Sequence, residues 1–304
     1  MSIESTIGNL RQILNIRALA KEAPLAARFL VNSLDALSYP QTVKPYNKLL
    51  EKIDFNDPHH DANQNPVMLV PGFMESPKIY FPYLDELRRL NIRHAYWVPL
   101  YPFMSVEENA FTLSIIIRDV LKRTGRYKIN LIGHSMGGLV VFYAAKENPH
   151  YIDKCVALGT PFHGTKFAKK AHDFLSFLIR KKGISYAEKT GYSLKALSQM
   201  FPENDFAKNL ALDNGVNYYS IFSENDEVVL PWGSAIIKGA TNMNVNEDLG
   251  LKDVGHIRLV YESDITTTVA KILHNCKKSE LLELGDSFYQ IHLPHEHCPA
   301  AVSL

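Results

Sequence analysis

The sequence predicts an α/β fold in which a mostly parallel, twisted sheet is covered by helices on both faces. Short apolar runs, typical of buried strands, alternate along the chain with longer segments whose apolar residues recur at helical spacing. One of these strands passes directly into a helix through the glycine-rich turn GHSMG, residues 133–137. In such sheets the functional groups gather at the carboxyl ends of the strands, so we look for candidates just after each strand.

The elements of the predicted core follow one another from residue 67 onward. The expected strands cover residues 67–70, 94–100, 127–132, 154–158 and 218–222. The expected helices cover residues 79–90, 106–122, 136–146, 166–182, 193–212 and 264–273.

The predicted organisation has three parts. Residues 1–65 form a helical arm packed on the core, with a surface for a membrane or a partner protein as the alternative. Residues 66–276 form the core, which carries an inserted helical lid or cap at 165–217, and residues 277–304 form a tail. The histidines near residues 59–61 are expected in a solvated loop, and those at 292–298 lack the spacing of a closed zinc site, so no metal is predicted.

Composition narrows the class of protein. The chain has 304 residues, of which 46% are hydrophobic and 21% charged, and its net charge is +1. A chain without a broad positive field is not expected to bind nucleic acid. We also find no apolar run of membrane-spanning length, no secretory signal and no C-x-x-C pair among the three cysteines. These features predict a cytoplasmic protein, with export by a leaderless route as the alternative.

Ser135 is the predicted nucleophile. It lies in the pattern G-x-S-x-G, formed with Gly133 and Gly137, between an apolar strand and a helix. A sharp strand-to-helix turn places the serine at its crest, and the following helix points its N–H groups at a developing oxyanion. His134 cannot fold back to act as the base and is expected to pack beside the turn.

A serine hydroxyl needs a base to take its proton and an acid to hold that base. His256, in the turn DVGHIRLV, is the predicted base, with His163 as the rival. Asp226, directly after the last predicted strand, is the predicted acid, and Glu224 is the reserve. Asp253 is too close in sequence to His256 to be favoured. The resulting chain order is Ser, Asp, His.

Two backbone N–H groups are predicted to form the oxyanion hole. Met136 follows the nucleophile, and Phe73 lies in the loop LVPGFMES after the first predicted core strand. The loop needs Gly72 whether it serves this purpose or is a simple turn.

Five segments carry a resemblance to a known family: LVPGF, NLIGHSMGG, VALGTPFHG, SENDEVV and VGHIRLV. In this order and at these intervals they resemble the α/β-hydrolase lipases and esterases, and most of all the bacterial triacylglycerol lipases. The resemblance covers about residues 67–271. It implies an α/β-hydrolase fold with Ser135 as nucleophile, Asp226 as acid and His256 as base, and the amides of Phe73 and Met136 as oxyanion donors.

The insertion favours an apolar substrate. Residues 166–182 predict a basic amphipathic helix, which either forms a lid that shapes the acyl site or packs on the core as an ordinary cap. Aromatic and apolar residues near the predicted mouth suggest an acyl pocket. These predicted substrate-binding residues are Met74, Phe162, Phe167, Phe174 and Trp232.

Together these features predict a serine hydrolase for carboxylic esters with an apolar acyl chain, acting through an acyl-enzyme on Ser135 and needing no cofactor. A phospholipase or acyltransferase and a thioesterase are alternatives on the same residues, and a non-catalytic binding scaffold is a more distant one. The predicted partner is a small lipid or ester substrate, with peripheral contact to lipid surfaces through the lid.

Overall fold

The computed structural model describes residues 64–73, 75, 80–89, 92–98, 100–101, 104–182, 194–202, 204 and 210–273. The predicted N-terminal arm up to residue 63 and the predicted tail at 277–304, with their histidine clusters, lie outside these residues. Met74 and the part of the insertion between residues 183 and 193 also lie outside them.

A parallel sheet of six strands forms the centre of the described chain, in the order β2-β1-β3-β4-β5-β6. The strands are β1 (Val67–Val70), β2 (Ala95–Trp97), β3 (Ile129–His134), β4 (Ile152–Leu158), β5 (Asn217–Phe222) and β6 (Thr241–Asn244). The chain runs from β1 outward to β2, then returns to place β3 on the other side of β1. The strand order therefore reverses between β1 and β3, which is where ligands bind in open sheets of this kind.

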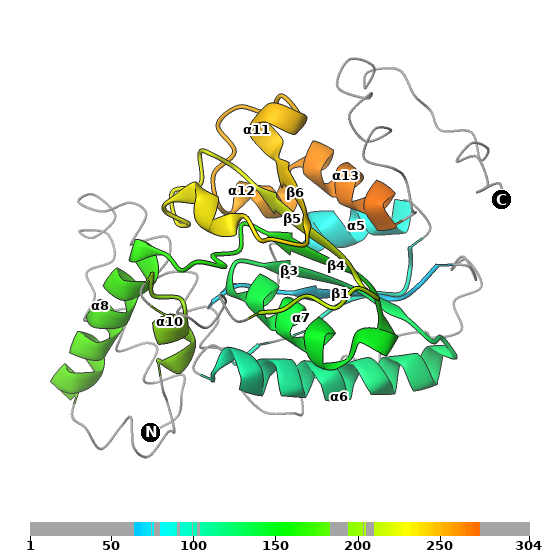
Figure 1. The fold of residues 1–304 in the computed structure, drawn as a ribbon, viewed down its shortest axis with the longest axis horizontal. Coiled ribbons are helices and arrows are strands. Elements are labelled where there is room, and N and C mark those ends of the chain that lie inside the picture. The colour runs from blue at the N-terminus through cyan, green and yellow to red at the C-terminus, as the bar shows by residue number, and fades with distance from the viewer. Residues whose placement is uncertain are drawn as a thin grey trace.

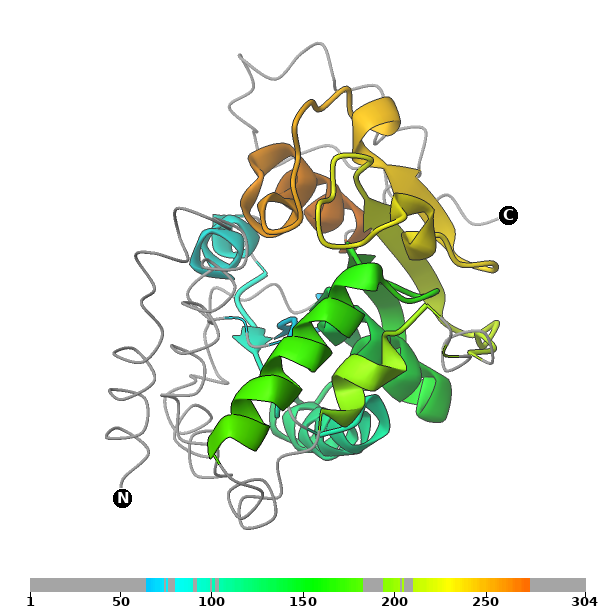
Figure 2. The same cartoon turned by 90° about the vertical axis from the view of Figure 1, so that its left-hand side faces the viewer.

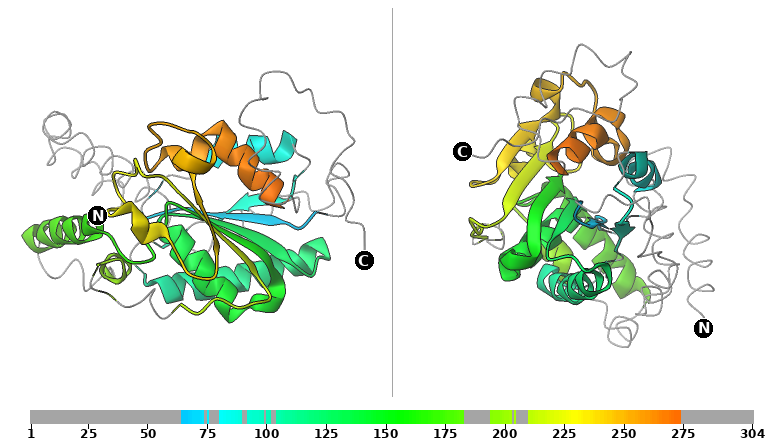
Figure 3. Two further views of the ribbon diagram at one scale, coloured as in Figure 1. Left: turned by 45° about the horizontal axis from the view of Figure 1, so that its top comes forward. Right: turned by 90° about the vertical axis from the view of Figure 1, so that its right-hand side faces the viewer.

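Helices cover both faces of the sheet, as predicted. They are α5 (Phe81–Arg89), α6 (Val106–Thr124), α7 (Met136–Glu147), α8 (Lys166–Lys182), α10 (Lys195–Gln199), α11 (Val245–Asp248), α12 (Arg258–Tyr261) and α13 (Ser263–Leu273). Helices α6 and α7 lie on one face, and α5, α12 and α13 lie on the other (Figure 1). Both panels of Figure 3 show the same layering, with α13 and α6 on opposite sides of the sheet.

Successive side chains of a strand point to opposite faces of the sheet, so β1 contributes to two hydrophobic cores. In β1, Met68 and Val70 join the core under α6 and α7, whereas Val67 and Leu69 join the core under α5 and α13. All four side chains are fully buried. Such double burial explains why β1 is continuously apolar rather than alternating in sequence.

Helix α6 shows how local sequence sets the bounds of an element. Ser105 caps its first turn by accepting a hydrogen bond from the Glu108 amide, and the Glu108 side chain accepts one from the Ser105 amide. Gly125 ends the helix in the left-handed conformation, with φ of 65°.

Helices α8 and α10 belong to the predicted insertion and lie side by side outside the sheet (Figures 1 and 2). Helix α8 has the predicted bounds. Its buried side chains, Ala168 and Ala171, belong to the α6–α7 core, while Lys166, Lys169 and Lys170 are exposed.

The structure corrects two predictions about elements. The predicted helix at 193–212 is shorter within the described residues, where α10 ends at Gln199; Pro202 lacks an N–H to continue a helix. Strand β6 was not predicted, because its sequence TNMN is short and polar. Among the described helices, none is both long and apolar enough to cross a membrane.

Candidate active site

Ser135 occupies a strained turn at the carboxyl end of β3. Its φ is 53° and its ψ is −122°, a conformation that side-chain-bearing residues rarely adopt. Its amide donates a hydrogen bond to the carbonyl of Leu158 at 2.9 Å, which ties the turn to the end of β4. Ser135 is partly exposed, whereas His134 and Met136 on either side are fully buried. The turn therefore leaves Ser135 partly exposed to solvent, while the residues on either side of it are buried.

Two glycines allow the turn to pack closely. A Cβ on Gly137 would lie 2.2 Å from the carbonyl oxygen of Val70, and one on Gly133 would lie 2.4 Å from the carbonyl oxygen of Gly137. No side chain fits at such distances. Gly137 is thus required by the approach of α7 to the end of β1, and Gly133 by the approach of the first turn of α7 to the end of β3.

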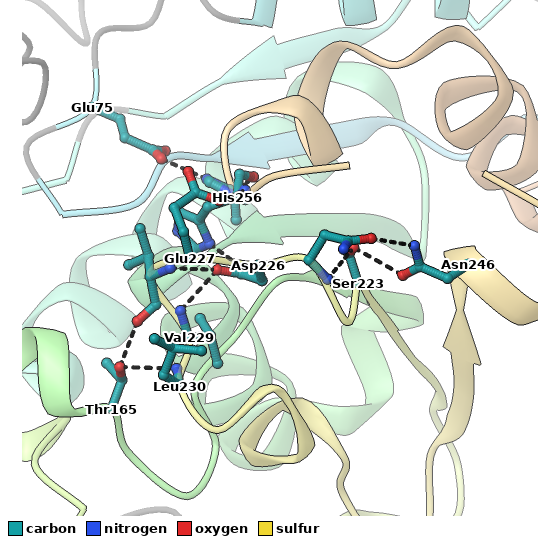
Figure 4. A network of polar contacts seen from close by, with 12 residues as sticks. Glu75, Thr165, Ser223, Asp226, Glu227, Val229, Leu230, Asn246 and His256 are labelled. Carbon is teal, nitrogen blue, oxygen red and sulfur yellow. Dashed lines mark hydrogen bonds and ion pairs between the residues drawn. The ribbon is translucent and has the colours of Figure 1, made fainter. Parts of the chain in front are cut away.

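Asp226 and His256 form a buried pair near the same edge of the sheet (Figure 4). Asp226 Oδ2 lies 2.7 Å from His256 Nδ1, and the two side chains are 2% and 4% exposed. Asp226 Oδ1 accepts hydrogen bonds from the amides of Val228 and Val229, each at 2.8 Å. The amide of His256 donates to Glu227 Oε2 at 2.9 Å. The Asp226 side chain is therefore held by the backbone of its own loop, and the backbone of His256 is hydrogen-bonded to the residue that follows Asp226.

The electrostatics of this pair favour its charged form. Burial alone raises the pKa of Asp226, but the charge and hydrogen bond of His256 and the two backbone amides outweigh burial and lower it. Burial alone lowers the pKa of His256, but Asp226 outweighs burial and, with Glu75 and Glu227, raises it. Asp226 is thus held as a carboxylate that stabilises a proton on His256.

Gly159, the first residue after β4, makes room for the pair. Its φ is 53°, and a Cβ there would lie 2.8 Å from Leu259 Cδ1, 3.1 Å from Asp226 Oδ2 and 3.2 Å from His256 Nδ1. The glycine appears in the segment VALGTPFHG, but its relation to the pair depends on tertiary structure that the sequence pattern did not reveal.

The rival residues lie elsewhere. His163 is exposed, and its Nε2 lies 2.9 Å from the carbonyl oxygen of Ile236. Glu224 is exposed and accepts a hydrogen bond from the Asn244 side chain at 2.8 Å. Asp253 adopts a positive φ of 57°, and its carbonyl accepts a hydrogen bond from Arg258. Of the candidate acids and bases, Asp226 and His256 are the two that form a buried pair.

The predicted oxyanion residues flank the turn. Met136 begins α7 directly after Ser135, and Phe73 lies in the loop that follows β1. Both side chains are buried in the α6–α7 core, at 0% and 7% exposure. Gly137 in α7 lies against the carbonyl groups of Val70 and Pro71, so α7, which carries Met136, and the loop that carries Phe73 meet at this point.

The predicted substrate-binding residues fall in different environments. Phe162 is buried, with its ring centroid 4.8 Å from that of Phe142, and Phe167 is partly buried against the same core. Trp232 is 37% exposed and stacks on Phe222 at 5.8 Å. The side chain of Phe174 lies outside the described residues.

Sequence reasoning missed Glu75, a carboxylate at the same site. Its Oε1 lies 2.6 Å from His134 Nδ1, and its Oε2 accepts the amide of Gly72 at 2.5 Å. The rings of His134 and His256 are 4.5 Å apart between centroids. Donor atoms of Glu75, His134 and His256 lie within 4.8 Å of one another, a spacing that suits a metal ion. Both ring nitrogens of His134 face other protein atoms, however, so a metal ion at His134 would have to replace one of these contacts.

Comparison with known proteins supports the predicted fold. Residues 65–177 match the family model described as alpha/beta hydrolase fold. The solved structures of Bacillus licheniformis lipase BlEst2 superpose with TM-scores of 0.53 for the mature form and 0.55 for the propeptide form, each at 18% identity. These alignments cover 71% and 72% of this chain, and 94% and 52% of the lipase chains. The chain therefore has the α/β-hydrolase fold.

Sequence similarity extends to lipases over a short stretch. The chain is 42% identical over 59 residues to a triacylglycerol lipase of Pseudarthrobacter phenanthrenivorans and, equally, to one of Burkholderia plantarii. The stretch covers 19% of this chain and only 18% and 16% of the two lipases. The predicted resemblance to α/β-hydrolase lipases and esterases is confirmed at this level.

Proposed function

We propose that this protein is a serine hydrolase that cleaves carboxylic esters with an apolar acyl chain. The observation that carries the proposal is the buried Asp226–His256 pair beside the strained turn of Ser135. His134, the residue next to Ser135, has its ring against the ring of His256, which brings the histidine loop to the turn. The similarity to triacylglycerol lipases and the fold shared with lipase BlEst2 support the same chemistry.

The proposed reaction has two halves. Ser135 Oγ attacks the ester carbonyl while His256 takes the hydroxyl proton, and Asp226 stabilises the resulting imidazolium. The amides of Phe73 and Met136 donate to the oxyanion of the tetrahedral intermediate. His256 then protonates the leaving alcohol, and a water molecule, activated by the same histidine, releases the acid from the acyl-enzyme.

Exposed apolar side chains near the start of α8 support an apolar acyl group. Leu230, Trp232 and Ile236 are 44%, 37% and 40% exposed. The amide of Lys166, the first residue of α8, donates to the carbonyl of Leu230, so these residues adjoin the insertion. An apolar surface beside a hydrolytic site suits a substrate with a hydrocarbon chain.

A covalent probe and a substrate series test the proposal. A fluorophosphonate should label the folded protein and should fail to label Ser135→Ala. With nitrophenyl esters of increasing chain length, the wild-type protein should hydrolyse medium or long acyl chains faster than acetate, and Ser135→Ala should be inactive. Absence of labelling in folded protein would favour a non-catalytic binding scaffold instead.

Product analysis distinguishes ester hydrolysis from the alternative reactions. If ester products accumulate when acceptor alcohols are added, the protein is an acyltransferase on the same residues. A higher kcat/KM for acyl thioesters or for phospholipids than for the matched simple esters would assign it to the corresponding class.

A further inference from the structure

Glu75 is a buried carboxylate whose partners all offer it hydrogen-bond donors. Its side chain is 7% exposed. The Gly72 amide donates to Oε2, and the hydroxyl of Tyr80 lies 3.4 Å from the same oxygen (Figure 4 shows Glu75 beside His256). Burial alone raises the pKa of Glu75, but the charge and hydrogen bond of His134, with His256 and the Gly72 amide, outweigh it and lower the pKa. Glu75 is therefore ionised at neutral pH.

His134 lies between two acceptors. Its Nδ1 faces the Glu75 carboxylate at 2.6 Å, and its Nε2 faces the carbonyl oxygen of His256 at 3.0 Å. A carbonyl and an ionised carboxylate accept hydrogen bonds only, so each contact requires a proton on the facing nitrogen. Two protonated nitrogens make the ring an imidazolium. Its side chain is fully buried, and the adjacent carboxylate balances its charge.

The contacts of this pair join three separate segments. His134 is the last residue of β3, and Ser135 follows it. Glu75 and Gly72 belong to the loop after β1, which also carries Phe73, while the His256 carbonyl belongs to the loop before α12. We propose that Glu75 and His134 form a buried ion pair that positions the oxyanion loop and the histidine loop against the Ser135 turn.

This positioning role rests on the proposed hydrolytic function, but the ion pair itself does not. The pair holds a backbone group at each of its two ends, namely the Gly72 amide at Glu75 and the His256 carbonyl at His134. Because His134 contacts both loops from the end of β3, it fixes their separation, and with it the distance between the oxyanion donor and the base. Neither Glu75 nor His134 contacts the substrate in this role, so both are positioning residues.

Nitrogen-15 NMR of the histidine rings in the full chain tests the charge state directly. At pH 7.5 both nitrogens of one ring should have shifts of protonated imidazole nitrogens, and this signal should be absent in His134→Gln. In Glu75→Gln the ring should become neutral, because an amide no longer balances its charge. A wild-type spectrum in which every histidine ring carries an unprotonated nitrogen would overturn the ion pair, whether or not the protein hydrolyses esters.

Kinetics tests the positioning role on the same variants. Glu75→Gln should lower kcat by about 100-fold, the effect of a misplacement on the order of 1 Å, with little change in KM. The matched control is Asp119→Asn, which removes a carboxylate from an exposed ion pair with Arg123 on α6 and should leave kcat unchanged. Thermal unfolding establishes that each variant is folded. A folded Glu75→Gln variant with the wild-type kcat would refute the positioning role, and wild-type protein without hydrolytic activity would refute the proposed function instead.

Discussion

Replacing Asp226 by asparagine tests the proposed triad through the tautomer of His256. Oδ1 of Asp226 accepts two backbone amides, from Val228 and Val229, so this position must hold an oxygen. In Asp226→Asn the amide oxygen keeps that place, and the NH₂ group must then face His256 Nδ1. Since NH₂ only donates, Nδ1 must accept, and the proton of the neutral ring moves to Nε2. A ring protonated at Nε2 cannot take the proton of Ser135.

The structure therefore predicts a large and specific loss. A wrong tautomer with the geometry intact costs about 10⁴-fold in kcat, or roughly 5.5 kcal/mol of transition-state stabilisation. The assay is steady-state hydrolysis of the best nitrophenyl ester from the chain-length series, with thermal unfolding to establish that the variant is folded. Glu224→Gln is the matched control, because this carboxylate lies two residues away, is exposed and bonds Asn244 instead. The reasoning is refuted if folded Asp226→Asn stays within about tenfold of the wild type, or if Glu224→Gln loses as much.

Three further predictions use the surroundings of the pair. The kcat/KM should rise with pH around an apparent pKa above 6.5, because Asp226 raises the pKa of His256. The ring must be neutral to accept the proton of Ser135, so activity increases as His256 loses its proton. A rise centred below 6.5 would contradict this prediction. Gly159→Ala and Gly125→Ala should each destabilise the fold by about 1 kcal/mol, since both glycines have positive φ. Only Gly159→Ala should also reduce kcat, because its Cβ would crowd Asp226 and His256, whereas no atom lies within 4 Å of a Cβ at Gly125. Equal kcat values in the two variants would be evidence against this crowding. Trp232→Ala should raise KM for long-chain esters more than for short-chain esters. The control is Tyr127→Ala, which removes a ring that is 90% exposed and should change neither KM. If Trp232→Ala raised both KM values equally, Trp232 would not belong to the acyl site.

The sequence predicted the architecture well where burial leaves a periodic signal. Helix α8 has the predicted bounds, because its apolar residues recur at helical spacing. The strands β1, β3 and β4 were found because burial on both faces makes them rich in apolar residues. Strand β6 lacks that signal: two of its four residues, Thr241 and Asn242, are not buried, and its neighbour β5 supplies its register.

Side-chain partners were predictable only where local sequence carried them. The turn of Ser135 and the order Ser, Asp, His are visible in motifs, and the buried Asp226–His256 pair fits that order. Glu75 meets His134 across 59 positions of sequence, and no spacing rule predicts such a contact. Gly159 appeared to be part of a motif, but its function in clearing space for the pair depends on the approach of two loops.

Main-chain hydrogen bonds explain how distant residues gather so reliably at this edge. The Ser135 amide bonds the carbonyl of Leu158, and the next amide, that of Gly159, bonds the carbonyl of Ile221 at 2.9 Å. These two bonds connect the carboxyl ends of β3, β4 and β5, and Asp226 follows shortly after β5. No side chain takes part in them. The turn and the loop that carries Asp226 are thus held by the sheet itself. We therefore expect that exchanging a side chain of the proposed triad changes the chemistry while the scaffold around Ser135 persists.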